Sequence, residues 1–545
     1  MLVYGDDSER VDPHRELLRI REELGSGFLD HDGLTAAFID LAGVTQGVAD
    51  AHFREAAADG YRPDEATLLA QLVPLALQLF RSWESGCIGA PGTSLTIPPG
   101  LPDEVEVRVP EGYAFYALAP EGYGLAARQL CLRAPPRIIG LRSIGTGLAC
   151  MAAAALGSAR PVTLRPVGDP FRRELRIAPE LADALLAGEA HYVIVDEGPG
   201  LSGSSFGAVA DWLEDRGVAP ERISFLPGHG NAPGPQASER HRTRWAAAQK
   251  PAVALDRPHL PTIEALVGPL SQPLQDISGG AWRPLWSAAE QQWPAVDPMW
   301  ERRKFLARTA SGTWLVKFAG LGRIGRSKLA LARDLHRAGF GPEVAGLKQG
   351  WLVSRWHEDA VATRPNTTEL LAYLRLRASW PAAQPGAPLE TLLAMVRRNL
   401  PSLADWTPDL SRLQPKPVCT DNRMAAYEWL RLPSGQLLKA DALDHHAAHD
   451  LIGCQDIAWD LAGAAVELSL EDRQTRALAD SLDADPALLA FYRTAYIAFR
   501  VGAHRLSAGA LGHWPQEQRR NLQAAERLEA LLPSVDAVEH AGHVH

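Results

Sequence analysis

Residues 191–206, HYVIVDEGPGLSGSSF, combine an apolar run with two acids, a glycine-rich loop and the beginning of a helix. Residues 193–195 are apolar and β-branched, which predicts a strand buried on both faces of a parallel sheet. Glycines let the backbone turn sharply and expose its N–H groups, here at Gly198, Gly200 and Gly203. Hydroxyls follow at the helix N-terminus, which favours anions, on Ser202, Ser204 and Ser205. The stretch predicts a phosphate-binding loop with Asp196 and Glu197 at its mouth; the alternative is a plain turn with a serine cap.

Strands and helices are expected to alternate around this stretch. Residues 137–156 form a second strand-loop-helix unit, followed by a strand at 161–167, a helix at 179–186, and beyond the central motif a helix to 215 and a strand at 222–226. This alternation predicts a doubly wound parallel sheet whose ligands bind at the carboxyl ends of the strands. The second loop, at that same edge, consists of Arg142, Ser143, Gly145, Thr146 and Gly147.

The two loops and the acid pair resemble the type I phosphoribosyltransferases. The resemblance implies that Asp196 and Glu197 act in catalysis by holding the ribose hydroxyls of phosphoribosyl pyrophosphate. It also implies that the loop from Gly200 to Ser205 binds the 5′-phosphate and that the Arg142 loop binds the pyrophosphate. Counting back from the loop places Glu197 and Gly198 at the acid positions, so either the loop is one residue longer than in the family or one acid is missing.

Composition sets broad limits on the function. The chain has 545 residues, a net charge of −10 and 46% hydrophobic residues, which suits two or three globular domains and disfavours a protein that coats nucleic acid. Five cysteines without a C-x-x-C pair indicate neither a disulfide framework nor a zinc ribbon. An acidic N-terminus and the lack of a long apolar run predict no signal peptide, no membrane partner and a cytoplasmic location.

The flanking segments complete the first half. Residues 1–90 are expected to form a helical extension, with Pro74 kinking or breaking the helix at 64–83. Residues 91–250 are expected to form the phosphoribosyltransferase-like domain. In it, 105–129, with PEGY twice, are expected to be short strands and turns, and the second PEGY to lead into a helix. Its aromatic residues either stack on a base or pack a strand face. Residues 228–242 predict a surface loop or lid, and the Pro-rich residues 251–298 a linker between independently folding halves.

A lysine inside an apolar strand marks the second half. Residues 302–318 predict a hairpin with Lys317 in its second strand, where a buried amine needs a partner. The G-x-G-x-x-G at 320–325 is nominally a dinucleotide fingerprint, but it follows a hairpin strand and not the first strand of a βαβ unit. A dehydrogenase is therefore disfavoured.

Residues 299–532 resemble the aminoglycoside phosphotransferase and choline kinase branch of the protein-kinase-like fold, a bilobal α+β domain. The segments that carry the resemblance are PVCTDNRMAAYEWL, GQLLKADALDHH and GCQDIAWDLAGA. The resemblance implies that Asp421 orients the acceptor hydroxyl, Asp441 holds Mg2+ and Lys317 contacts the phosphates of ATP or another nucleotide. Asp456 and Asp460 are expected to cap and anchor a helix.

The chain departs from that family at several positions. Cys419 replaces a histidine, and Ala426 replaces the metal-binding asparagine, for which Asn422 is a possible substitute. The helix after Lys317 offers Asp334 but no glutamate to pair with the lysine. A cluster of acids and histidines follows Asp441 and could hold a transition metal or bind acceptor or phosphate; it consists of Asp444, His445, His446, His449 and Asp450. His445 and His449 would share a helix face.

Together these features predict a bifunctional transferase. One half would transfer a phosphoribosyl group and the other a phosphoryl group from ATP, on a small nucleotide-related or sugar-phosphate metabolite. The alternatives are a non-catalytic nucleotide-sensing protein and a small-molecule kinase of the antibiotic-modifying type with an accessory domain. The sequence leaves the oligomeric state open.

Overall fold

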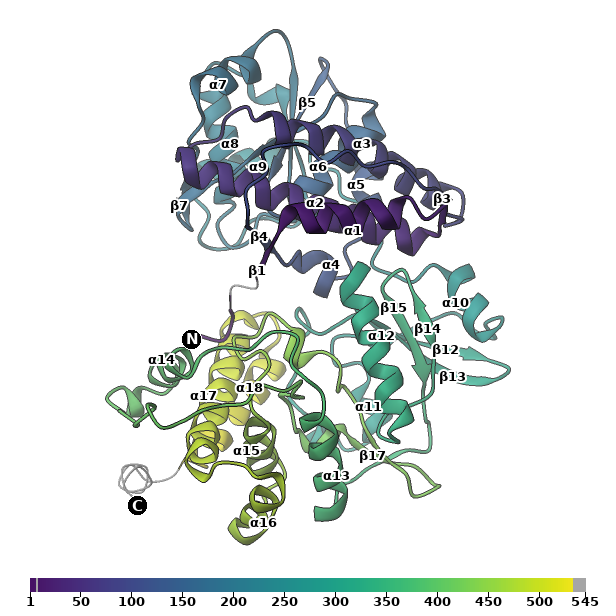
Figure 1. Cartoon of the computed structure of the whole chain (residues 1–545), viewed down its shortest axis with the longest axis vertical. Coiled ribbons are helices and arrows are strands. Elements are labelled where there is room, and N and C mark those ends of the chain that lie inside the picture. Colours follow the sequence, from purple (N-terminus) through teal and green to yellow (C-terminus); the bar gives the residue numbers. More distant parts are fainter. Residues whose placement is uncertain (6–7, 533–545) are drawn as a thin grey trace.

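The computed structural model describes residues 1–5 and 8–532, and Figure 1 shows two halves stacked along the long axis. The first half contains a four-stranded parallel sheet in the order β10-β9-β5-β6. Its strands are β5 (Pro136–Leu141), β6 (Val162–Leu164), β9 (His191–Val195) and β10 (Ile223–Leu226). The predicted parallel sheet is therefore confirmed for these strands, whereas the phosphoribosyltransferase identity stays a prediction.

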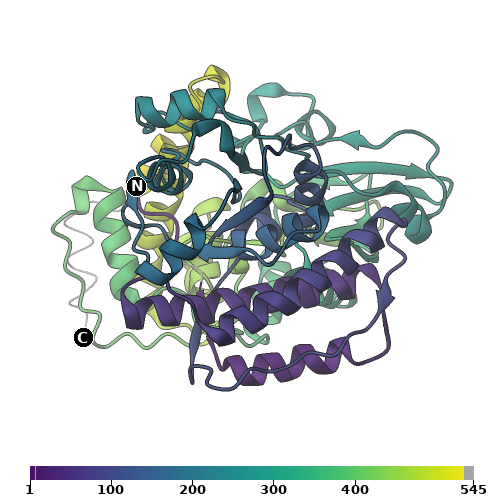
Figure 2. The same ribbon diagram turned by 90° about the horizontal axis from the view of Figure 1, so that it is seen from above.

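Helices cover both faces of this sheet. Ile139, Ile194 and Phe225 face a core formed with α7 (Pro179–Leu186), α8 (Ser204–Glu214) and α9 (Glu239–Ala247). Ile138, Val193 and Val195 face the opposite core, formed with α2 (His31–Ala56), α3 (Pro63–Glu84), α5 (Pro120–Ala127) and α6 (Gly145–Leu156). The first helices of the chain thus pack as one layer of the sheet domain, as seen from above in Figure 2.

Local expectations in the first half are only partly met. Helix α3 continues through Pro74, so the proline does not break it. The first PEGY segment forms a helix, α4 (Glu111–Phe115), where the expectation was short strands and turns, whereas the helix expected at the second PEGY is confirmed as α5. A strand precedes them only at β4 (Val105–Arg108), which pairs with β1 (Ser8–Val11). Proline suits the first turn of a helix because its missing N–H would be unpaired there anyway.

Short elements complete this half. They are α1 (Pro13–Leu24), which Asp12 caps, β2 (Phe28–Leu29), β3 (Ala90–Pro91), β7 (Val167–Asp169), β8 (Arg172–Glu174) and the 3-10 helix η1 (Pro220–Arg222). The loop at 228–242 lies on the glycine-rich loop, since the N–H of Gly234 donates to the carbonyl of Gly200 at 3.0 Å. It ends in α9, so only its first part is irregular.

The second half begins with a five-stranded antiparallel sheet in the order β11-β12-β13-β15-β14. These strands are β11 (Gln275–Asp276), β12 (Lys304–Thr309), β13 (Gly312–Phe318), β14 (Val344–Lys348) and β15 (Trp351–Arg355). The hairpin β12–β13 is confirmed, with Lys304 opposite Lys317. β11 comes from the segment expected to be a linker, which also contains α10 (Leu260–Val267), α11 (Arg283–Trp286) and η2 (Glu290–Gln292). Helix α12 (Gly322–Arg337) follows the sheet's hairpin.

A mainly helical part follows. It contains α13 (Thr367–Ala378), α14 (Leu389–Asn399), α15 (Ile457–Glu467), α16 (Asp472–Leu482), α17 (Pro486–Ala510) and α18 (Pro515–Glu529). A small sheet of β16 (Val361–Ala362), β17 (Trp429–Arg431) and β18 (Leu437–Lys439) and the turns η3 (Pro401–Leu403), η4 (Ala426–Glu428) and η5 (His445–Ala447) lie between these helices. The second half is thus an α+β unit of two parts, a sheet part and a helical part.

A continuous core joins the two halves. Phe305, Trp314 and Val353 of the antiparallel sheet belong to the same apolar cluster as α2 and α3. The carboxylate of Asp40 in α2 pairs with Arg323 in α12 at 3.0 Å. This packing argues against independent folding of the halves, although the domain boundaries themselves stay a prediction. Among the described residues, none of the helices combines the length and apolarity needed to cross a membrane.

Candidate functional site

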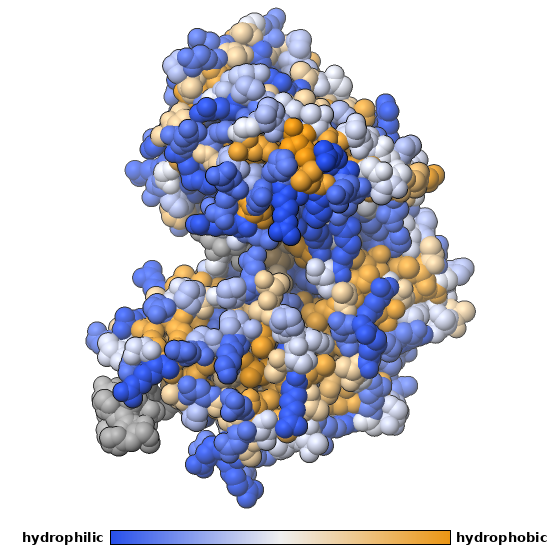
Figure 3. All heavy atoms as spheres, in the orientation of Figure 1, coloured by the Kyte–Doolittle hydropathy of each residue, from blue (hydrophilic) through white to orange (hydrophobic). Residues whose placement is uncertain are grey.

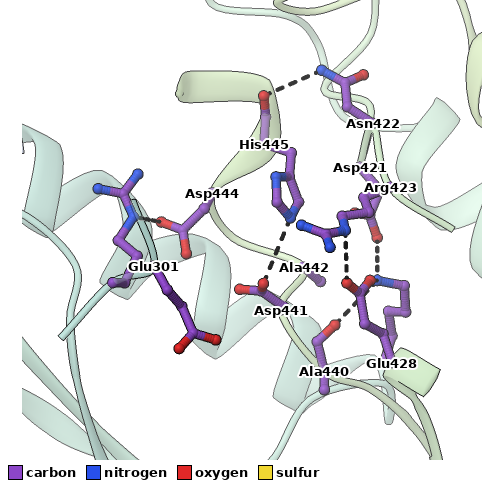
Figure 4. Close-up of polar contacts among 12 residues, drawn as sticks. Glu301, Asp421, Asn422, Arg423, Glu428, Ala440, Asp441, Ala442, Asp444 and His445 are labelled. Atoms are coloured by element: carbon purple, nitrogen blue, oxygen red, sulfur yellow. Dashed lines mark hydrogen bonds and ion pairs between the residues drawn. The ribbon is translucent and has the colours of Figure 1, made fainter. Parts of the chain in front are cut away.

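Lys317 lies at the centre of a charged cluster between the sheet and the helical part. Its ammonium group contacts the carboxylate of Asp441, directly after β18, and that of Asp444 at 2.6 Å. Asp444 also accepts from Lys328 of α12 at 2.5 Å and lies 3.6 Å from the guanidinium of Arg302. Figure 4 shows Asp441 and Asp444, with His445 facing Asp441. Three cations thus face two carboxylates, a balance that suits a polyphosphate.

The cluster holds both of its acids ionised. Burial alone would raise the pKa of Asp441, but Lys317 and His445 outweigh it and hold that pKa well below its usual range. Burial would likewise raise the pKa of Asp444, and Lys317 and Lys328 lower it instead. Burial lowers the pKa of Lys328 to about 8, which Asp444 only partly offsets. Lys317 thus has two carboxylate partners, Asp441 and Asp444. The half-buried Asp334 pairs with Arg337 instead.

Asp421 is buried beside Lys439. The ammonium of Lys439 lies 3.2 Å from the Asp421 carboxylate and 2.8 Å from that of Glu428, and its side chain is fully buried. The Tyr373 hydroxyl also donates to Asp421. Burial would lower the pKa of Lys439, but the two carboxylates raise it. Lys439 is therefore a fixed positive charge next to the proposed base.

Asp460 fixes the backbone that carries Asp421. Its two carboxylate oxygens accept from the N–H groups of Asp421 at 2.7 Å and of Asn422 at 2.8 Å. Burial, with a contribution from Asp421, raises the pKa of Asp460 to about 7. Asp456 caps α15, since its side chain accepts from the N–H of Ala458 at 2.9 Å. The predicted anchoring roles of Asp456 and Asp460 are confirmed.

One group of the described residues can hold a metal ion. Ligand atoms of Glu428, Asp441 and His445 all lie within 4.8 Å of one another, and the Nε2 atom of His445 is buried without a hydrogen-bond partner among the described residues. Carboxylate oxygens suit Mg2+, and an imidazole in the set also suits Mn2+. The amide of Asn422 instead donates to the carbonyl of Gly453 at 2.7 Å, and its Oδ1 atom makes no hydrogen bond in the described chain. The residues fit a divalent cation centred on Asp441.

The neighbouring histidines do not form one metal site. His445 lies in a short 3-10 turn and faces Asp441, with 3.6 Å between Nε2 and the carboxylate. His449 lies among aromatic rings, 4.7 Å from that of Tyr4 and 5.0 Å from that of Phe115. The expected shared helix face of His445 and His449 is wrong, because no α-helix forms there.

Sequence reasoning missed Lys439, Lys328 and Glu428. Lys439 could have been found by the signal that identified Lys317, a lysine inside an apolar strand, here LLKAD. Glu428 gives no comparable signal, because it reaches the site through a 3-10 turn, η4.

The acids of the first half lie at the carboxyl end of β9. Asp196 and Glu197 are partly exposed, and the Tyr123 hydroxyl donates to the carbonyl of Asp196 at 3.0 Å. Burial of its carboxyl group raises the pKa of Asp196 to about 7. Burial, with Asp196 and Glu111 adding to it, raises the pKa of Glu197 to about 8. At this edge of the sheet, both acids could bind a cation or accept hydrogen bonds from the hydroxyl groups of a ligand.

The glycine-rich loop has the backbone expected of it. Gly200 and Gly203 adopt φ of 55° and 64°, and α8 begins at Ser204. The hydroxyls of Ser202 and Ser204 donate to the carbonyl of Pro170 at 3.2 and 2.7 Å, so they hold the β7–β8 hairpin to the loop. Ser205 is partly exposed in the first turn of α8.

The second predicted loop is mostly buried. Arg142 is 6% exposed and pairs with Asp59 and, at 3.3 Å, with Asp50 of α2. Its expected role in pyrophosphate binding is not supported by this position. Thr146 and Gly147 are buried in α6, where Gly147 packs against α2. Ser143 is partly exposed, and Gly145, at the start of α6, lies next to Val195 and Asp196. Helix α2, which the sequence placed in a separate extension, covers this loop.

Helix α4 lies between the two sites. On one side, Gly112 packs against the Glu197 carboxyl group, since a Cβ atom added at this glycine would be 3.1 Å from it. On the other, the carbonyl of Tyr113 accepts from the N–H of Leu321 at 2.9 Å, at the start of α12, and Arg302 donates to the carbonyl of Ala114 at 3.2 Å. Figure 3 shows a hollow between the halves in this region. The two predicted sites thus share one short helix as a wall.

The raised pKa of Glu197 predicts a pH-dependent stability. Its usual value is 4.5 and its folded value about 8, so between these pH values the folded state holds a proton that the unfolded state has lost. The free energy of unfolding should fall as the pH rises through this window. Glu197→Gln should remove part of this fall and stabilise the protein by about 2 kcal/mol at pH 9.

Urea denaturation at pH 5.5, 7 and 9 measures the effect. Glu180→Gln, at an exposed position in α7, serves as the matched control and should keep the pH dependence of the wild type. An equal slope in Glu197→Gln and wild type would contradict the raised pKa.

Neither a protein-family model nor a curated protein sequence matches the chain. Among solved structures, it is similar to choline kinase LicA from Streptococcus pneumoniae, at 17% identity and TM-score 0.30, over 42% of this chain and 89% of that one. A choline/ethanolamine kinase family protein from Mesorhizobium loti matches at 17% identity and TM-score 0.33, over 52% and 96%. Aminoglycoside phosphotransferase APH(4)-Ia matches at 12% identity and TM-score 0.26, over 49% and 97%. At such low values, function has to be inferred from the side chains of this chain.

Proposed function

We propose that the second half transfers a phosphoryl group from a nucleoside triphosphate, such as ATP, to a hydroxyl group of a small molecule. The observation that carries this proposal is a connected network of charges in which Lys317 pairs with Asp441 and Lys439 pairs with Asp421. Glu428 links the two pairs, since it contacts Lys439 and has a ligand atom within 4.8 Å of one of Asp441. Phosphoryl transfer depends mainly on positioning and charge neutralisation, and these residues supply both.

Each residue has a distinct role in this proposal. Lys317, Lys328 and Arg302 bind the phosphate oxygens, after exchange of their present contacts with Asp444. Asp441, with Glu428 and His445, holds a divalent cation, which neutralises charge on the phosphates when bound. Asp421 orients the acceptor hydroxyl and accepts its proton, and Lys439 holds the Asp421 carboxylate in place through their ion pair.

Titration calorimetry of the whole protein with ATP, in the presence of Mg2+ or Mn2+, tests the binding part. Phosphate transfer is then measured against a panel of amino alcohols, sugars and nucleosides. We expect binding that requires the divalent ion. Lack of nucleotide binding with either ion would contradict the proposal.

We also propose that the first half binds a phosphoribosyl compound such as phosphoribosyl pyrophosphate. The support is the left-handed glycine loop at the start of α8, next to the acids Asp196 and Glu197. The phosphate would bind at the N-terminus of α8, and the two acids would accept hydrogen bonds from the ribose hydroxyls. With catalysis in both halves, the chain would be a bifunctional transferase.

Gly203→Ala should weaken binding of phosphoribosyl pyrophosphate at least tenfold. Its φ of 64° disfavours any side chain, and the new Cβ atom would lie 3.3 Å from Pro233 of the covering loop. Calorimetry gives the affinity. Gly217→Ala is the matched control, because φ there is 85° and no atom lies within 4 Å of the new Cβ. Equal affinities in both variants would contradict a phosphate site at this loop.

A further inference from the structure

Two cysteines, Cys419 and Cys454, lie on neighbouring segments close to Asp421. The N–H of Val418 donates to the carbonyl of Gln455 at 2.8 Å, and the N–H of Gln455 donates to the hydroxyl of Thr420 at 3.2 Å. Residues 418–420 and 454–456 therefore run side by side. This pairing places Cys419 and Cys454 next to each other, on neighbouring segments of the chain. Cys419 is partly exposed, whereas Cys454 is buried.

The surroundings give the two sulfur atoms different properties. The guanidinium of the fully buried Arg377 lies 3.9 Å from the sulfur of Cys419. The neighbouring Cys454, together with His446 and Arg377, lowers the pKa of Cys419 to about 4. The contact with Cys419 and burial raise the pKa of Cys454. One sulfur is thus an accessible thiolate and the other a buried thiol.

No other cysteine of the described chain has this arrangement. Burial raises the pKa of Cys87 to about 12 and also raises that of Cys150. Cys131 is exposed, but it lies at the far edge of the parallel-sheet half. A metal is not indicated at the cysteine pair, since Glu428, Asp441 and His445 form the one metal-competent group of the described residues.

We propose that Cys419 and Cys454 form a reversible disulfide when the protein is exposed to hydrogen peroxide, and that this bond switches off the phosphotransfer site. In the first step the Cys419 sulfur attacks a peroxide oxygen. The S–O bond forms, the O–O bond breaks, and the departing hydroxide takes up a proton to leave as water. In the second step the Cys454 sulfur attacks the Cys419 sulfenic acid. The S–S bond forms, the S–O bond breaks, and the hydroxide leaves as water with the Cys454 proton.

The effect on the site follows from chain geometry. Cys419 precedes Asp421 by one intervening residue, and Cys454 precedes the segment that carries Asp460. A disulfide fixes the Cβ atoms of its cysteines about 3.8 Å apart. The bond would thus constrain the backbone two residues before Asp421, whose carboxylate lies 3.2 Å from Lys439 and whose N–H donates to Asp460. The inhibition rests on the proposed phosphotransfer, whereas disulfide formation does not.

Mass spectrometry of the full chain tests the disulfide itself. The reduced protein is exposed to peroxide, the remaining thiols are blocked, and the digest is searched for a linked peptide pair. We expect a Cys419–Cys454 pair that disappears on treatment with dithiothreitol. In Cys454→Ser, and equally in Cys454→Ala, Cys419 should accumulate as a dimedone adduct. Cys131→Ser should leave the linked pair unchanged.

Thiol labelling of the wild type gives an independent measure. At pH 6, iodoacetamide should modify Cys419 at least tenfold faster than Cys131, although Cys131 is the more exposed. Faster labelling of Cys131, or peroxide treatment without a Cys419–Cys454 pair, would overturn the proposal. A disulfide that forms without loss of phosphotransfer would overturn the switch. A protein without any phosphotransfer would overturn the proposed function and leave the disulfide result standing.

Discussion

Asp421→Asn is expected to lower phosphotransfer by about 10² to 10³-fold and to leave nucleotide affinity within about twofold. Asp441→Ala should instead abolish metal-dependent nucleotide binding. The reason is the division of contacts in the structure. Asp441 lies with Lys317 and His445 in the cation cluster, whereas Asp421 is buried beside Lys439. An amide still fits beside Tyr373 and Lys439, but it cannot accept the proton of the attacking hydroxyl.

Steady-state kinetics and calorimetry separate the two effects. Asp334→Asn is the matched control, because this acid lies in α12 and pairs only with Arg337 at the surface. It should retain both turnover and affinity. Full turnover in Asp421→Asn would refute a catalytic role for this carboxylate, and nucleotide binding by Asp441→Ala that still responds to the metal would place the ion elsewhere.

Lys439→Met is expected to destabilise the protein by about 3–5 kcal/mol. Removal of one partner from a buried ion pair leaves an uncompensated charge, and here two carboxylates, Asp421 and Glu428, would lose their shared partner. Glu428 would keep Arg423 at 3.1 Å, whereas Asp421 would keep the hydrogen bond from the neutral Tyr373 but no ion pair among the described residues. Chemical denaturation monitored by tryptophan fluorescence measures the loss.

Two further variants make this test specific. Lys348→Met removes a lysine that pairs with Asp30 and Asp32 at the surface, and it should cost less than about 1 kcal/mol. Lys439→Met combined with Asp421→Asn should recover part of the lost stability, because the ammonium of Lys439 and the carboxylate of Asp421 are then both removed and Asp421 leaves no unpaired buried charge. A Lys439→Met variant as stable as the wild type would show that Lys439 does not neutralise these acids.

The strands could be predicted from the sequence because their signal is local. Residues 193–195 are apolar without interruption, and the hairpin at Lys317 shows the alternation of a half-buried sheet. The helix of the first PEGY segment was not predicted, since proline and glycine are common to turns and to helix starts. Only the packing of Tyr113 and Tyr123 into the core decides between them.

The candidate site was predictable only where a motif marks it. Asp421, Asp441 and Lys317 each follow or lie in a recognisable segment, and they do come together. The partners that set their charge, Lys439 and Asp444, depend on contacts between segments that are distant in the sequence. Arg142 was assigned to a site by a motif, but its side chain lies elsewhere. Its loop fits a motif, but Asp50 and Asp59 of the N-terminal helical region bind its guanidinium.

Helix α4 has a consequence for how this protein could have changed over time. Its five residues contact Glu197 on one side and the beginning of α12 on the other, and the core around α2 continues from one half into the next. A recombination event that replaced either half with a homologous domain would break these contacts unless the incoming domain matched α2 and α4. We therefore expect the halves to have been inherited together, and a substitution in α4 to require a compensating change in the other half.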